Sequence, residues 1–183
     1  TLPLGETIDS ISKATPIDLL KTQLHQMHDI SETRSDPAYS AMFSGLSGTG
    51  WQWINLLFLA GGIWLVKKGI ADWRIPTAFL ISLVVISNLF AVIDYSSYSS
   101  PLFHAFSGGT MLCAFFIATD PVTASTTPLG RWIYGAGIGA LVYIIRNWGG
   151  YPDGIAFAVI LMNMAAPLID YYTQPRVYGD QDS

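Results

Sequence analysis

The chain has 183 residues, of which 51% are hydrophobic and 12% charged, and its mean hydropathy is +0.40. Soluble domains carry about 25% charged residues, so this composition favours a membrane protein over the alternative, a large soluble helical core. The net charge of −4 provides no basic patch for nucleic acid. The single cysteine excludes an intramolecular disulfide and a cysteine-ligated cluster.

The charged residues are unevenly distributed along the chain. Residues 1–50 are polar and charged, whereas residues 51–183 contain long uncharged runs. Since the chain does not begin with Met and carries no signal-peptide pattern, we expect the C-terminal half of a longer protein. We predict a polar extramembrane segment, 1–50, followed by a transmembrane helical domain, 51–183, with a short C-terminal tail.

Five windows are apolar enough to cross a bilayer, which takes about 20 residues of helix. The sequence therefore predicts an all-α integral membrane protein with helices at about 53–66, 76–93, 102–119, 129–145 and 154–169. Proline should end the third helix after Asp120, and Pro167 should kink or end the last. The small residues Gly135, Gly137 and Gly139 suit close helix packing in lipid.

Lysine and arginine set the expected orientation, because cytoplasmic loops are enriched in them. One side of the membrane would hold Lys67, Lys68, Arg74, Arg131 and Arg176. The other side would hold Lys13, Lys21, Arg34 and Arg146, three of them in the long segment 1–50. This balance places the segment 1–50 outside and the C-terminus in the cytoplasm.

Within the polar segment, Thr15 and Pro16 suit the N-cap and the first position of a short amphipathic helix. Its apolar face would consist of Ile17, Leu20, Leu24 and Met27. On spacing alone, Thr15 is a capping residue. The alternative is that its hydroxyl is esterified to a flavin phosphate, since a helix N-terminus favours phosphate.

The pattern Asp9-x-x-Ser12-x-Ala14-Thr15 resembles the flavinylation signal D-x-x-S-G-A-T, except that Lys13 stands where the signal has glycine. Periplasmic flavin transferases recognise that signal and join FMN through its phosphate to the final threonine. Further stretches are similar to the D subunit of the Rnf electron-transport complex and to the related B subunit of the sodium-pumping NADH:quinone reductase. These stretches are residues 45–51, 73–76, 116–123, 127–131 and 146–158.

The resemblance implies one half of a ten-helix bundle in the bacterial inner membrane, with FMN on Thr15 at the periplasmic side and the C-terminus in the cytoplasm. Electrons would pass within a complex that couples ferredoxin–NAD oxidoreduction to ion movement. Expected partners are the other subunits of that complex, a periplasmic flavin transferase and the lipid bilayer. A non-covalent riboflavin is a further implied cofactor without assigned contacts.

The sequence offers no pattern for NAD or iron–sulfur binding, since it has no G-x-G-x-x-G after a strand and no cysteine cluster. Other subunits would therefore bind NAD and the iron–sulfur centres of a redox chain. Two alternatives stay open: a cofactor-free half of a transporter or channel, and a structural membrane anchor.

Three charged residues near the expected helix ends have competing interpretations. Asp120 is a candidate for a cation or proton pathway, and the alternative is that it caps a helix or pairs with Arg131. Arg146 could neutralise a flavin phosphate, or snorkel to the interface. Asp153 is predicted to cap the helix that begins near Gly154.

Several uncharged residues are expected to serve the fold. Asn88 and Asn163 should form hydrogen bonds between helices, and His104 should bond a neighbouring loop. Cys113 should pack as a small hydrophobic residue. Gly149 and Gly150 either allow a backbone to approach a flavin or form a tight turn.

Overall fold

The computed structural model describes residues 17, 51–93, 98–151 and 153–175, and over these residues every regular element is a helix. In chain order the elements are α4 (Trp51–Lys67), α5 (Arg74–Ile93), α6 (Pro101–Phe106), α7 (Thr110–Leu112), the π-helix η1 (Cys113–Ile117), α8 (Pro128–Trp148) and α9 (Ile155–Thr173). Of the described helices, α5, α8 and α9 are long and apolar enough to cross a membrane. The prediction of an all-α integral membrane protein is confirmed.

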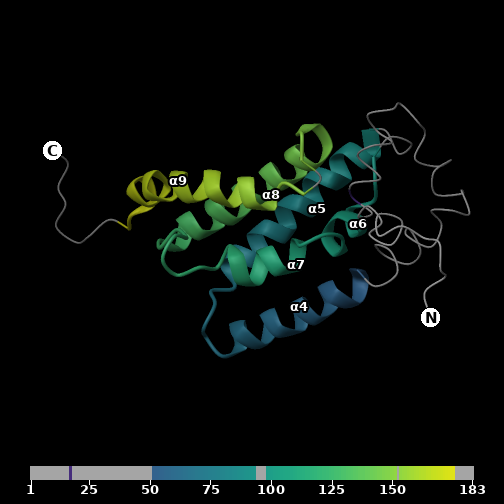
Figure 1. Ribbon diagram of the computed structural model, residues 1–183. Coiled ribbons are helices and arrows are strands. Elements are labelled where there is room, and N and C mark those ends of the chain that lie inside the picture. The colour runs from purple at the N-terminus through teal and green to yellow at the C-terminus, as the bar shows by residue number, and fades with distance from the viewer. Residues whose placement is uncertain (1–16, 18–50, 94–97, 152, 176–183) are drawn as a thin grey trace, which may run out of the picture.

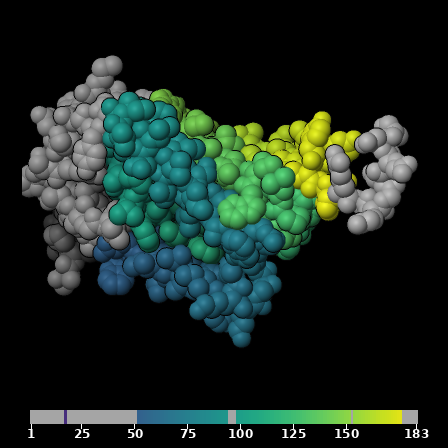
Figure 2. Space-filling model, turned by 180° about the vertical axis from the view of Figure 1, so that it is seen from behind, coloured from purple at the N-terminus to yellow at the C-terminus, as the bar shows by residue number. Residues whose placement is uncertain are grey.

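The helices run back and forth between two ends of the molecule (Figure 1). At one end, called here the Trp148 end, α5 and α8 finish and α4 and α9 begin. At the opposite end, the Arg131 end, α5 and α8 begin and α4 and α9 finish. α8 packs against both α5 and α9, whereas α4 contacts α6, α7 and η1 and lies along one edge of the molecule (Figure 2).

The segment expected as one helix over 102–119 is broken in the structure. α6 ends at Phe106, Ser107 is extended, and Gly108 has a φ of +60°, before α7 and η1 continue to Ile117. A left-handed φ costs glycine little and other residues more, so the Ser107–Gly109 turn is possible at this position. Hydropathy reports only the apolar composition of the window, and the break in the backbone leaves that composition unchanged.

The last helix also differs from the expectation. α9 passes through Pro167 and continues to Thr173, so Pro167 does not end it. Proline in a helix interior removes one backbone hydrogen bond. The helix nevertheless extends far enough to place Asp170 beside the start of α8, a contact described below.

Glycines in α8 allow its backbone to pack directly against the backbone of α5. A Cβ added to Gly135 would lie 2.5 Å from the Ile75 carbonyl oxygen, and one added to Gly139 would lie 2.5 Å from the Phe79 carbonyl oxygen. Ser82 Oγ donates a hydrogen bond of 2.8 Å to the Ala136 carbonyl across the same contact. The predicted role of these small residues in close helix packing is confirmed.

Gly139→Ala is therefore expected to lower the free energy of unfolding by about 1–3 kcal/mol, because the new methyl group overlaps backbone that cannot move aside. Gly137→Ala is the matched control. Its Cβ would meet the flexible Met162 side chain, at 2.5 Å from Cε, so we expect a smaller loss. Thermal unfolding of the detergent-solubilised protein measures both. Equal losses for the two variants would contradict the assignment.

Candidate functional site

The most deeply buried charge among the described residues belongs to Arg146, near the end of α8. Its side chain is 1% exposed. Nη2 forms an ion pair with Asp153 Oδ1 at 3.0 Å, and Nη1 donates to the His104 carbonyl oxygen at 2.8 Å. Nη2 also donates to Thr110 Oγ1 at 2.9 Å. The expectation that Arg146 snorkels to the interface is wrong, because the guanidinium is enclosed by the broken helix.

Asp153 joins this network instead of capping α9. Its Oδ1 accepts from Arg146, and its Oδ2 accepts from the backbone N–H of Gly109 at 3.1 Å. The N-cap of α9 is Gly154, which makes no side-chain capping bond. The predicted capping role is thus replaced by a link between the α8–α9 connection and the Ser107–Gly109 turn.

Asn55 holds the same turn from the side of α4. Its Nδ2 donates to the Phe106 carbonyl oxygen at 2.8 Å and to the Gly108 carbonyl oxygen at 3.0 Å, and its Oδ1 accepts from the Met111 N–H at 3.2 Å. The backbone groups freed by the helix break are therefore bonded by a buried amide, as they must be away from water. Asn55 was not among the residues predicted from the sequence, although it is a lone amide inside an apolar window.

Four buried polar side chains at the Trp148 end have atoms without a hydrogen-bond partner among the described residues. They are Ser99, His104, Ser107 and Tyr143, with both ring nitrogens of His104 included. The predicted bond from the His104 side chain to a loop is not made; its backbone carbonyl oxygen, and not its ring, accepts from Thr110 and Arg146. The His104 ring lies instead 5.2 Å from the Tyr143 ring, within an aromatic cluster that includes Phe90 and Trp148.

One described residue of the segment 1–50 reaches this network. Ile17 is helical and 3% exposed. A Cβ added to Gly108 would lie 2.7 Å from Ile17 Cδ1, 2.5 Å from Asp153 Oδ2 and 3.2 Å from Arg146 Nη2. The Ile17 side chain thus occupies space at Gly108 that any other residue there would fill.

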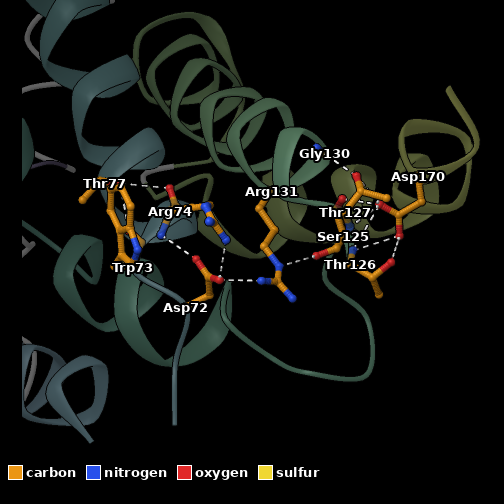
Figure 3. A network of polar contacts seen from close by, with 10 residues as sticks. All are labelled: Asp72, Trp73, Arg74, Thr77, Ser125, Thr126, Thr127, Gly130, Arg131 and Asp170. Carbon is orange, nitrogen blue, oxygen red and sulfur yellow. Dashed lines mark hydrogen bonds and ion pairs between the residues drawn. The ribbon is translucent and has the colours of Figure 1, made fainter. Parts of the chain in front are cut away.

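A second polar network lies at the Arg131 end (Figure 3). Asp72 forms ion pairs with both Arg74, at 3.2 Å, and Arg131. Arg131 also donates from Nε to the Ser125 carbonyl oxygen at 3.4 Å. The suggested pair between Asp120 and Arg131 is therefore not the one that forms, because Asp72 takes the guanidinium.

Asp170 organises the other half of that network. Its carboxylate accepts from the side chains of Ser125, Thr126 and Thr127 and from the backbone N–H groups of Thr126 and Thr127, and these contacts converge from the loop before α8 (Figure 3). Thr127 in turn caps α8 by accepting from the Gly130 N–H at 3.0 Å. The end of α9 is thereby fastened to the beginning of α8.

Asp120 lies between these two sets of contacts and bonds within its own turn. Its Oδ2 accepts from Thr123 Oγ1 at 2.7 Å, and its Oδ1 accepts from the Val122 N–H at 3.4 Å. It also lines a cavity of about 140 Å³ together with Asp72 and Arg131. These bonds close the turn at residues 120–123, so among the described residues the Asp120 side chain neither caps a helix nor pairs with Arg131.

Of the remaining uncharged candidates, some have the predicted role and others do not. Tyr134 donates to Asn163 between α8 and α9, as predicted for an interhelical amide. Cys113 is fully buried in the hydrophobic core. Asn88 lies exposed on α5, where the expected bond to a neighbouring described helix is not made. Gly149 ends α8 with a bond to the Ile145 carbonyl oxygen at 2.9 Å, as in a tight turn.

The residues of the flavinylation pattern, Asp9, Ser12, Ala14 and Thr15, lie outside the described residues. The structure brings together Arg146, Asp153, the Ser107–Gly109 turn and Ile17. The sequence had indicated Arg146, Asp153 and, as part of an apolar helix face, Ile17, but not the turn. A glycine pair after serine, in the middle of an apolar window, was the available signal for the turn.

The long apolar helices α5, α8 and α9 are those of a multi-pass α-helical membrane protein. A sequence profile described as the NQR2, RnfD, RnfE family matches residues 2–179. The chain belongs to this family.

Three similar proteins are each named as the D subunit of an ion-translocating oxidoreductase complex. That of Vibrio vulnificus is 56% identical over 172 residues, which is 94% of this chain and 47% of the relative. That of Cronobacter sakazakii is 55% identical over 94% of this chain and 48% of the relative. That of Escherichia fergusonii is 54% identical over 98% of this chain and 49% of the relative. The chain spans about half the length of the curated relatives it matches.

Proposed function

We propose that the chain is part of a membrane subunit of an ion-translocating oxidoreductase complex of the ferredoxin–NAD type, and that it carries electrons through FMN esterified to Thr15. One observation carries the proposal. The pattern Asp9-x-x-Ser12-x-Ala14-Thr15 occurs in a chain 54–56% identical to proteins named as the D subunit of an ion-translocating oxidoreductase complex.

The surroundings of Ile17 fit this proposal. Ile17 follows Thr15 by two residues, and two peptide units extend at most about 7 Å. Since Ile17 is buried at Gly108, a flavin on Thr15 would be tethered at the Trp148 end. Lys67, Arg74 and Arg131 lie at the opposite end, so the positive-inside rule supports a periplasmic flavin and a cytoplasmic C-terminus in the inner membrane.

When bound, FMN would supply the redox chemistry, and the chain's own residues would hold and orient it. Arg146 is poorly suited to bind the phosphate directly, because its guanidinium is already bonded to Asp153, Thr110 and the His104 carbonyl. A non-covalent riboflavin belongs to the proposal without assigned residues.

The proposed partners are other subunits of the complex, and a periplasmic flavin transferase for attachment of FMN. Large apolar side chains on the outside of the described helices would contact lipid or those subunits. The most exposed include Trp53, Leu57, Val92, Met164 and Leu168. Asp120 stays a proposed ion-pathway residue.

Thr15→Ala is expected to abolish covalent flavin, because the hydroxyl that forms the phosphoester is gone. Co-expression with a flavin transferase, followed by flavin fluorescence on a denaturing gel and by intact mass, measures the label. Wild-type protein should be fluorescent and Thr15→Ala dark, and Lys13→Gly tests whether the departure from the signal limits labelling. An unlabelled wild type that supports ion flux in vesicles would favour the cofactor-free transporter instead.

A further inference from the structure

We propose that the Ser107–Gly109 turn is a docking seat for the segment that carries Thr15, with the Ile17 side chain as its anchor and the Arg146–Asp153 pair as the support that holds the seat in shape. This inference rests on the proposed function for its purpose, the positioning of a flavin. The contact between Ile17 and the turn stands independently of any flavin.

The seat exists because residue 108 has no side chain. Gly108 has a φ of +60°, which other residues adopt only with strain. The position of its missing Cβ is approached by a methyl carbon of Ile17, a carboxylate oxygen of Asp153 and a guanidinium nitrogen of Arg146, all within 3.2 Å. An apolar anchor and a buried ion pair therefore meet at one backbone position.

The turn beneath the anchor is fixed from three elements. Arg146 of α8 holds the His104 carbonyl, Asn55 of α4 holds the Gly108 carbonyl, and Asp153 before α9 holds the Gly109 N–H. The bonds of Arg146 and Asp153 are charge-assisted, and such bonds are stronger than neutral ones. A side chain docked on the turn therefore has a defined place relative to the membrane helices.

The anchor, Ile17, belongs to the apolar face of the predicted amphipathic helix in segment 1–50. Ile17 is 3% exposed, and the burial of its apolar side chain stabilises the docked arrangement. Burial of Ile17 also restricts how far Thr15, two residues away in the chain, can move. A flavin attached there would lose much of its rotational freedom. Gly108, Ile17 and the Arg146–Asp153 pair are thus positioning residues for the flavin, without contact to its reacting atoms being required.

A cysteine cross-link tests the seat without a flavin. In a Cys113→Ala background, Asp18→Cys, next to the intact Ile17 anchor, is combined with Gly109→Cys, whose φ of −88° accepts a side chain, and treated with a short bifunctional thiol reagent. One control replaces Gly109→Cys with Val122→Cys, 85% exposed on the loop at the Arg131 end, and a second control adds Ile17→Ala to the 18–109 pair. We expect at least about tenfold more product from the 18–109 pair than from either control, since docking through Ile17 raises its effective concentration. Equal yields, or no 18–109 product, would overturn the proposal.

Flavin mobility tests the positioning role. In labelled full-length protein, Ile17→Ala and Gly108→Ala should lower the fluorescence anisotropy of the attached FMN and shift its midpoint potential. Gly69→Ala is the matched control, because Gly69 also has a positive φ, +72°, but has nothing within 4 Å of an added Cβ. Unchanged anisotropy and potential in the seat variants would contradict the role. A wild-type protein without flavin fluorescence would refute the proposed function but not the seat, since the cross-link tests the seat without a flavin.

Discussion

Arg146→Met is expected to lower the free energy of unfolding by about 3–5 kcal/mol, the cost of removing one partner from a buried ion pair. The arginine is 1% exposed and donates to Asp153, Thr110 and the His104 carbonyl. Its loss leaves the Asp153 carboxylate without its charged partner and removes one of the two donors to the His104 carbonyl oxygen, and methionine replaces only the packing. Thermal or detergent-induced unfolding of the solubilised protein measures the loss.

Arg74→Met is the matched control for this prediction. Arg74 is also paired with an aspartate, Asp72, but its side chain is 33% exposed. Ion pairs on the surface contribute about 0–1 kcal/mol, so Arg74→Met should change stability little. Similar losses for the two variants would show that the buried network does not stabilise the Trp148 end.

The double variant Arg146→Met with Asp153→Leu distinguishes charge from hydrogen bonding. Removing both charges eliminates the uncompensated carboxylate, so part of the stability should return. Full recovery is not expected, because the Gly109 N–H loses its acceptor and the His104 carbonyl oxygen keeps only the Thr110 hydroxyl as donor. A double variant no more stable than Arg146→Met would contradict the assigned coupling between the two residues.

Asp170→Ala is expected to destabilise the Arg131 end by about 1.5–3 kcal/mol, the range for hydrogen bonds to a charged group, because the buried residues Ser125 and Thr127 lose this acceptor. The carboxylate accepts from Ser125, Thr126 and Thr127 and so joins the end of α9 to the start of α8. Without it, the loop before α8 should become a site of proteolytic cleavage. Thermal unfolding and limited proteolysis, read by mass spectrometry, measure both effects.

Two further variants sharpen the Asp170 prediction. Asp170→Asn keeps one acceptor oxygen and should lose less stability than Asp170→Ala. Asp120→Asn is the control, because Asp120 bonds only within its own turn, to Thr123 and the Val122 N–H. Faster cleavage in Asp120→Asn than in Asp170→Ala would mean that Asp120, and not Asp170, holds the loop.

Much of the helical architecture could be predicted from the sequence. Three of the five predicted apolar windows correspond to bilayer-length helices, α5, α8 and α9, and the close packing at Gly135 and Gly139 and the core position of Cys113 also agree with the structure. Each of these features depends on residue types along one segment. The candidate site was only partly predictable. Arg146 and Asp153 attracted notice as charges near helix ends, but Arg146 does not snorkel to the interface and Asp153 does not cap α9.

The sequence by itself determined the all-α membrane fold, the family resemblance and the flavinylation pattern around Thr15, because each depends on the order and composition of neighbouring residues. The tertiary structure decided which charges meet: Asp72 with Arg131, Asp153 with Arg146, and it also brought Ile17 to Gly108. These pairs form where helix ends and a broken helix converge in space. Hydropathy and local spacing carry no information about that convergence, because side chains far apart in the chain become partners only after the helices have packed.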